Sequence, residues 1–287
     1  MDWTEYSRVR MLRAKSRPAD VAVQTIEGFR KHRSGRNAAL ISHFGFISVF
    51  PLLLVFTTVL GFVLQNNAKL LTDIKDSALA QLPFVGGQIA TDPSKLEGNA
   101  LVLILGVVIS LWGGMKAFIA VHGALDDIAE IPLDDRANLF ITRLHALLGI
   151  LYVGGAQIGA AILASIATIT NIAVVGTVLL LAGAVAINAG VLALSYRWLR
   201  TTRPTWHSIA PGAIVGGVLF AALQAFGVAI VGRAIAKASP VYGKDFASVI
   251  GLLTWLSLHA MISLGGAELN AALIADGPPR PPDCDDQ

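Results

Sequence analysis

The sequence has little of two things that water-soluble proteins need. Charged residues make up only 14% of its 287 residues, whereas about 25% is typical of a soluble domain. It also has a single cysteine, Cys284, which excludes a disulfide within the chain and a metal site built from several thiolates. So few charges do not cover the surface of a soluble globule, and an apolar outer surface is therefore indicated.

Signatures of common catalytic sites are missing as well. There is no glycine-rich phosphate loop, no HExxH zinc motif and no cluster of cysteine and histidine. The acidic run within residues 126–135 lacks the spacing of a calcium-binding loop. We interpret it as a solvated loop, with divalent-cation binding as the alternative. We expect no enzyme activity, no catalytic residue, no cofactor and no metal site.

The abundant feature is long apolar sequence without charge. Hydrophobic residues make up 54% of the chain, and the mean hydropathy is +0.65. No charged residue occurs between Arg143 and Arg197, which is room for two membrane spans, since a bilayer core takes about 20 residues of helix. Nothing alternates with the period of two that barrel strands require. The sequence predicts an all-α integral membrane protein with six transmembrane helices, at about residues 40–64, 99–124, 143–168, 173–196, 207–234 and 246–272.

The distribution of basic residues predicts the orientation in the membrane. Residues 1–37 contain nine Lys and Arg against four acidic residues, and residues 197–203 add three arginines after the fourth span. Because Lys and Arg are enriched in cytoplasmic loops, we expect both termini on the cytoplasmic side. The basic residues then meet anionic lipid headgroups at that face, and no nucleic acid partner is indicated.

Three regions are expected along the chain. Residues 1–37 form a basic cytoplasmic segment, in which the amphipathic residues 19–33 predict a short interfacial helix. Residues 38–275 form the six-helix transmembrane domain, whose outer segment 66–98 carries a second interfacial helix between spans one and two. Residues 276–287 are acidic and rich in proline, which predicts a disordered cytoplasmic tail.

Polar residues within or beside the predicted spans are the candidates for function: Glu268, Asn270, Lys116 and His43. Counting about 1.5 Å per residue along each span puts all four in the cytoplasmic half. Because charged groups inside a bilayer usually face the bundle interior, they predict a polar cavity open to the cytoplasm, in which Glu268 pairs with Lys116. The alternative is that Lys116 reaches the headgroups and that Glu268 ends a helix at the interface.

Small residues and one proline predict how the helices pack and bend. Gly155 and Gly159, and likewise Gly212 and Gly216, have the four-residue spacing that lets helix backbones approach closely. Such faces serve packing within the bundle or contact with a second copy in a homo-oligomer. Pro51 falls inside the first span, where it removes a backbone hydrogen bond and predicts a kink that acts as a hinge or sets the helix shape.

Several segments taken together carry a family resemblance. They are ISHFGFISVFPLLLVF, GGMKAFIAVHGALDDI, APGAIVGG, and SPVYGKDFASVIGLLTWL running to GGAELNA. These segments, spread over about residues 20–275, resemble the YihY/BrkB family of envelope proteins. The resemblance implies a multi-pass protein of the bacterial cytoplasmic (inner) membrane that supports envelope integrity. It carries family motif positions onto this chain at Pro51, Tyr242, Gly243, Glu268 and Asn270.

The resemblance and the residues leave three functions to weigh. The leading interpretation is a transporter or lipid translocator, with a lipid or a small solute as substrate and Glu268 as a proton, cation or headgroup site. The alternative is a non-transporting membrane scaffold that acts through partner contacts. A membrane-associated ribonuclease, named in the older family label ribonuclease BN, is least favoured, because the sequence offers no metal-binding cluster.

Overall fold

The protein is built from helices throughout the part of the chain that the structure describes. The computed structural model describes residues 16–63, 100–169, 175–242 and 244–275, and no strand occurs within these ranges. The all-helical prediction is confirmed. The elements are α2 (Arg17–Lys31), α3 (Ser34–Val63), α6 (Ala100–Ile128), the one-turn 3-10 helix η3 (Leu133–Asp135), α7 (Leu139–Ile169), α8 (Val175–Trp198), α9 (Trp206–Tyr242) and α10 (Lys244–Ala275).

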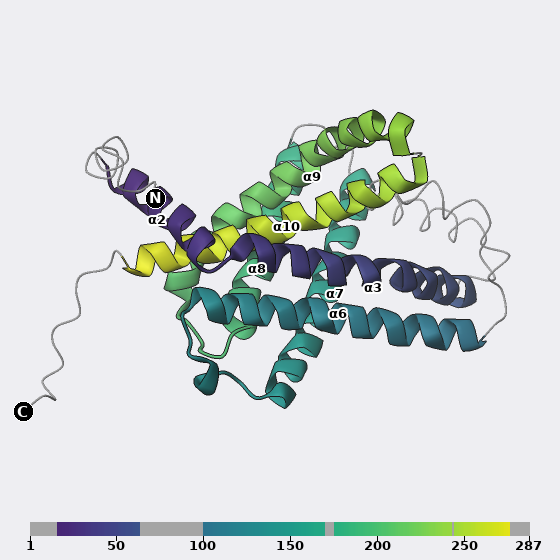
Figure 1. Cartoon of the computed structure of the whole chain (residues 1–287). Helices are drawn as coiled ribbons and strands as arrows, with labels where there is room; N and C mark the ends of the chain where they lie inside the picture. Colours follow the sequence, from purple (N-terminus) through teal and green to yellow (C-terminus); the bar gives the residue numbers. More distant parts are fainter. Residues whose placement is uncertain (1–15, 64–99, 170–174, 243, 276–287) are drawn as a thin grey trace, which may run out of the picture.

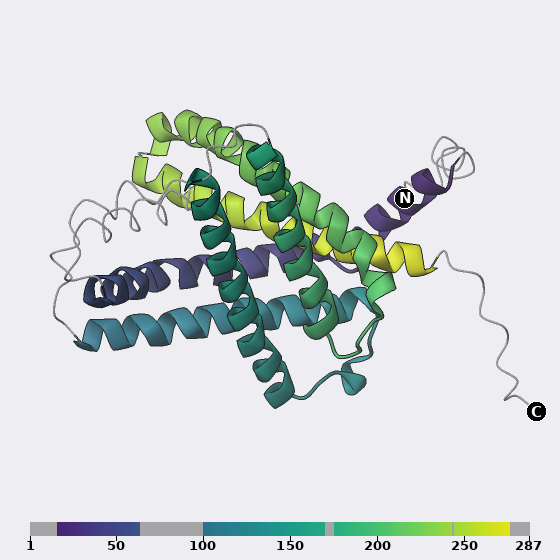
Figure 2. The same cartoon turned by 180° about the vertical axis from the view of Figure 1, so that it is seen from behind.

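Helix α10 lies at the centre of the arrangement. It packs against α9 on one side and against α3 on the other, and it also contacts α6 and α2 (Figure 1). Helices α3 and α6 lie side by side along most of their length. Helices α7 and α8 form a second pair that crosses this layer steeply, in front of it in the view from behind (Figure 2).

The outer surface of the bundle is apolar, as a bilayer requires. On α6, Ile104 is 60% exposed and Val108 is 56% exposed. Among the residues that the structure describes, four helices contain a stretch long and apolar enough to cross a membrane. The chain therefore has the composition of a multi-pass membrane protein, while the count of six spans and the orientation stay predictions. The four stretches are Ile104–Ile128, Leu139–Ala156, Trp206–Gln224 and Val249–Ala275.

One connection differs from the sequence prediction. Helix α9 runs through Pro240 to Tyr242 and α10 begins at Lys244, so the outer loop expected near residues 235–245 is mostly helical. The expected short helix before the first span is present as α2, and it packs against α10. The segment 66–98 with its second interfacial helix, and the tail 276–287, lie outside the described residues.

Both ends of the described chain meet at the same end of the bundle. Helix α2 and the last turns of α10 lie together there (Figure 1). The buried core also lies at this end, where the ends of α6, α8 and α10 meet the start of α9. Its largest fully buried apolar side chains include Leu199, Ile209 and Leu264. A well-packed core at this end gives a rigid frame for the polar groups around it.

Candidate functional site

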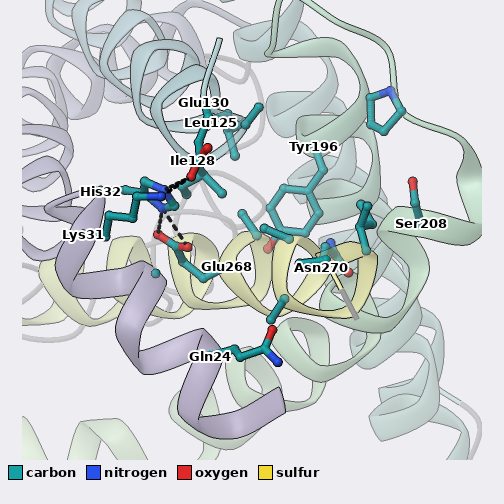
Figure 3. A pocket seen from close by; sticks show the side chains of 18 of the residues that line it. Gln24, Lys31, His32, Leu125, Ile128, Glu130, Tyr196, Ser208, Glu268 and Asn270 are labelled. Carbon is teal, nitrogen blue, oxygen red and sulfur yellow. Dashed lines mark hydrogen bonds and ion pairs between the residues drawn. The ribbon is translucent and has the colours of Figure 1, made fainter. Parts of the chain in front are cut away.

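A cavity of about 1100 Å³ lies at the end of the bundle where α2, the start of α9 and the last turns of α10 meet (Figure 3). The ends of α6 and α8 complete its walls. Its size compares with the roughly 300–1,000 Å³ of ordinary ligand sites. Two residues predicted from the sequence, Glu268 and Asn270, both line it.

Glu268 is buried in the cavity wall, with only 1% of its surface exposed. Ser34 Oγ donates a hydrogen bond to Glu268 Oε1 over 2.6 Å. His32 Nδ1 lies 3.0 Å from Glu268 Oε2. A buried carboxylate is costly unless it is paired and hydrogen-bonded, and both of these partners come from the junction of α2 and α3. That junction therefore stabilises the carboxylate.

Gly28 allows α2 to lie directly against this carboxylate. A Cβ atom at position 28 would collide with Glu268 Oε2 and would lie 3.8 Å from His32 Cε1. A side chain at this position would have to push the carboxylate or the whole of α2 away. The absence of a side chain at Gly28 is therefore part of the site's geometry.

The imidazole of His32 bridges two carboxylates. Its Nδ1 faces Glu268, and its Nε2 lies 3.4 Å from Glu130 Oε1. The His32 side chain is 11% exposed, whereas that of Glu130 is 61% exposed. Arg33 and Glu130 both have left-handed backbone, with φ of 55° and 53°. These residues end the helical path of α2 and α6 and turn the chain, so that the two helix ends face each other.

Glu130 also pairs with Lys31. The Lys31 ammonium group donates to Glu130 Oε1. The hydrogen bond from Lys31, and next that from His32, lower the pKa of Glu130 below its usual value. Glu130 therefore stays ionised near neutral pH and attracts the His32 ring, although an ion pair this exposed adds little stability.

Asn270 also lines the cavity, and its side chain binds the backbone of α9. Its Oδ1 accepts a hydrogen bond from Gly212 N over 2.7 Å, and its Nδ2 donates to Ile209 O over 3.1 Å. Pro211 lies between these two residues and has no N–H to give to the α9 hydrogen-bond ladder. The Asn270 amide binds the backbone on both sides of the proline, as a neighbouring helix often does in membrane proteins.

The acidic run within residues 126–135 is exposed at Glu130, Asp134 and Asp135, as a solvated loop would be, but it is not exposed at Asp126. Asp126 is 1% exposed, and it accepts hydrogen bonds from the N–H and the hydroxyl of Thr201, both over 2.8 Å. His122 Nδ1 lies 3.2 Å from Asp126 Oδ2. Asp127 pairs with Arg136 at 2.8 Å. The sequence interpretation is therefore wrong for Asp126, which joins α6 to the α8–α9 loop. Within the described ranges no group of three His, Cys, Asp or Glu side chains could hold a metal ion.

Lys116 and His43 do not line the cavity. The Lys116 ammonium group lies 5.9 Å from the centre of the Trp112 ring, on an exposed side of α6. His43 is exposed and meets the Phe44 ring edge-on. The expected pair of Glu268 with Lys116 is thus replaced by the contacts with His32 and Ser34. Counting residues along a helix gives depth, but it does not give the side of the helix that a residue occupies.

The glycine pair in α9 brings two different neighbours close. A Cβ on Gly212 would collide with the carbonyl oxygen of Gly266 in α10. A Cβ on Gly216 would lie 2.6 Å from Leu192 Cδ1 in α8. The two glycines, four residues apart, thus let α9 approach both α10 and α8. Gly155 faces open space, and the surroundings of its partner, residue 159, are outside what the structure describes.

The remaining family positions lie at helix interiors and ends. Pro51 lies within α3, and the helix continues through it. Tyr242 is the last residue of α9, and Gly243 lies outside the described residues. The hinge role of Pro51 stays a prediction.

Sequence reasoning missed the surroundings of Glu268. They are its hydrogen-bond partners His32 and Ser34, together with Gly28, which lies against its carboxylate, and Glu130, which bonds to His32. His32 and Ser34 lie in the basic run KHRSGR. The enrichment of Lys and Arg on the cytoplasmic side is by itself a sufficient reason for such a run. One signal pointed to them. The amphipathic helix before the first span ends at the same predicted membrane face as the last span, so its end and Glu268 share one depth.

Comparisons with known proteins give one consistent result. The family described as virulence factor BrkB matches residues 25–284. The chain is 24% identical over 271 residues to an uncharacterized protein of Dickeya dadantii (strain 3937), covering 88% of this chain and 81% of that protein. It is 22% identical over 295 residues to the inner membrane protein YhjD of Escherichia coli (strain K12), covering 91% and 82%. No solved structure matches the chain significantly.

Proposed function

Because the chain belongs to the virulence factor BrkB family, we propose that it transports a lipid or a small solute across the bacterial cytoplasmic membrane and thereby supports envelope integrity. The name of the Escherichia coli relative, an inner membrane protein, supports this location. Four helices able to cross a membrane support a multi-pass arrangement.

The observation that carries the proposal is the cavity with a buried carboxylate in its wall. Its volume of about 1100 Å³ is at the upper end of the roughly 300–1,000 Å³ that ligand sites have. Glu268 is desolvated at its wall, and polar groups buried in membrane proteins usually mark a substrate or ion path. The cavity therefore supports binding of a ligand with a polar group.

The charges around the cavity favour a ligand with an anionic group. Arg200 lines the same cavity as His32, and its buried Nε has no hydrogen-bond partner among the described residues. Burial lowers the pKa of the Arg200 guanidinium, against the opposing effect of the Asp126 charge. Arg30 and Lys31 line the side formed by α2. A phosphate group, on a lipid or on a free solute, would pair with the Arg200 guanidinium and neutralise its positive charge.

The test is transport by the purified full chain in proteoliposomes. Headgroup accessibility of labelled anionic and zwitterionic lipids, and flux of a labelled phosphorylated solute, are measured beside the variant Glu268→Gln. We expect wild-type protein to move one of these classes. Glu268→Gln should reduce that movement to the level of protein-free liposomes, since the amide cannot change its charge as the carboxylate can.

The matched control is Asp134→Asn, the same chemical change at an exposed position of η3 outside the cavity. It should transport like the wild type. Wild-type flux from a folded Glu268→Gln variant would remove Glu268 from the function. Absence of any movement in wild-type liposomes would overturn transport and would favour a membrane scaffold that acts through partners.

A further inference from the structure

We propose that Glu268 binds a proton and that His32, held by Glu130, carries this proton to it from the water outside the cavity. The proposal rests on the proposed function, because it names the ion that a transport cycle at this cavity would use. It assigns a role to the end of α2, which the transport proposal leaves open.

The three side chains form one continuous path from exposed to buried (Figure 3). Glu130 is 61% exposed, the His32 side chain is 11% exposed and the Glu268 side chain is 1% exposed. The two links are 3.4 Å from Glu130 Oε1 to His32 Nε2 and 3.0 Å from His32 Nδ1 to Glu268 Oε2. Each link lies at or close to hydrogen-bond length, so a proton needs no further carrier to reach the buried carboxylate.

The proton transfer is balanced at each step. The relay starts from a neutral His32 ring whose Nδ1–H donates to Glu268 and whose unprotonated Nε2 faces Glu130. A proton from water binds Glu130 and moves to His32 Nε2, while the Nδ1 proton moves to Glu268 Oε2. The ring is again neutral, now with its proton on Nε2, and Glu268 is a neutral carboxylic acid. One proton is taken from water and one carboxylate becomes neutral.

Charged groups from every neighbouring element surround this path. Helix α2 supplies Glu27, Arg30 and Lys31 to the same cavity, and Lys31 is bonded to Glu130. The α8–α9 loop supplies Arg200. The start of α3 supplies a neutral partner, Ser34, which donates to Glu268. These charged groups set the electrostatic surroundings of the path, while Ser34 provides a neutral hydrogen bond that serves Glu268 in both protonation states.

A second buried histidine–carboxylate pair shows that this arrangement is not general. Asp126 also accepts from His122, but Thr201 occupies both of its oxygens as well. His122 is 3% exposed, and its Nε2 has no hydrogen-bond partner within the described part of the chain. That pair therefore has no link to water through an exposed carboxylate. Of these two pairs in the described part of the chain, the His32 pair is the one with an exposed acid at its outer end.

Protonation of Glu268 changes the charge that the cavity presents. When Glu268 is ionised, its negative charge lines the same cavity as Arg200 and repels an anionic ligand. With Glu268 neutral, the cationic groups dominate and the ligand is favoured. Proton uptake through His32 would therefore favour loading of the cavity, and proton release would favour unloading.

The experiment follows Glu268 itself and needs no substrate. The full chain is purified in detergent micelles, and infrared difference spectra are recorded after a rapid drop in pH. The C=O stretch of the protonated Glu268 carboxyl is identified by its absence from Glu268→Gln. We expect this band to form in the wild type and to form about a hundredfold more slowly in His32→Gln, because glutamine does not relay a proton.

Two further variants sharpen the result. Gly28→Ala keeps every titratable group but forces the carboxylate away from α2, so it should also slow the band. His207→Gln makes the same chemical change as His32→Gln at an exposed position outside the cavity, and should leave the rate unchanged. Where His32→Gln does not give folded protein, Glu130→Gln takes its place as the test variant and should likewise slow the band. Its side chain is exposed, so this change should not disturb the packing.

The outcomes separate this proposal from the transport proposal. An equal rate in His32→Gln and wild type, or no Glu268 band in the wild type at any pH, would overturn the proton path. Because the spectra are recorded without substrate, transport in liposomes is unaffected by that result. Conversely, a failure of the liposome assay would leave a His32-dependent band intact.

Discussion

Replacing Gly212 by alanine should lower the free energy of unfolding by about 3 kcal/mol, at the upper end of the cost of overpacking a core. The new Cβ would collide with the Gly266 carbonyl oxygen and would lie 2.7 Å from Asn270 Nδ2. Backbone atoms of a neighbouring helix do not move aside as a side chain does. The change would also displace the Asn270 amide from the backbone around Pro211. Thermal unfolding in detergent micelles should show a melting temperature lower by about 6–12 °C.

Gly265→Ala is the matched control, because Gly265 has nothing within 4 Å of its ideal Cβ position. In a helix this change gains up to about 1 kcal/mol of propensity, so its melting temperature should equal or exceed that of the wild type. If Gly212→Ala unfolds at the same temperature as Gly265→Ala, α9 and α10 do not approach each other as closely as described.

The helices could be predicted because their signal is one of composition and length. Uncharged apolar stretches of about 20 residues have no stable state in a membrane other than a helix. Each of the six predicted spans overlaps a different long helix of the described chain, and four of these helices contain a stretch able to cross a membrane. The helix ends were less predictable: Pro240 suggests a break, yet α9 continues through it for another two residues.

The candidate site could be predicted only in part, for a geometric reason. Glu268 and Asn270 both line the cavity, since a carboxylate and an amide among apolar residues need polar surroundings. Their partners could not be deduced, because depth along a helix leaves its rotation unknown. His32 lies in a basic run of the sequence, and surface charge alone is a sufficient reason for that run. A short distance in space between residues 236 positions apart leaves no trace in one sequence.

The sequence also does not distinguish the roles of Asp126 and Asp127, because the two residues are adjacent and chemically identical. Asp127 is a partly exposed side chain that pairs with Arg136. Asp126, one residue earlier, points from α6 to the α8–α9 loop and receives both hydrogen bonds that Thr201 can give. A turn of about 100° per residue separates the two environments.

Asp126→Ala is therefore expected to destabilise the protein by about 3–5 kcal/mol, the usual result of removing one partner from a buried ionic network. It would leave the Thr201 N–H and hydroxyl and His122 Nδ1 without their acceptor. Thermal unfolding and the yield of folded protein in detergent measure the loss. Asp127→Ala is the control, and it should cost about 0–1 kcal/mol, because a partly exposed ion pair contributes little.

The two aspartates also differ in what they hold in place. Thr201 follows Arg200, which lines the cavity, so Asp126 fixes the loop that carries the cation of that wall. A residual folded fraction of Asp126→Ala should therefore transport less than Asp127→Ala at equal amounts of folded protein. Equal stability and equal transport of the two variants would show that the loop is held by its own packing. Arg200 would then owe its position to the apolar contacts of Leu199, which is fully buried beside it.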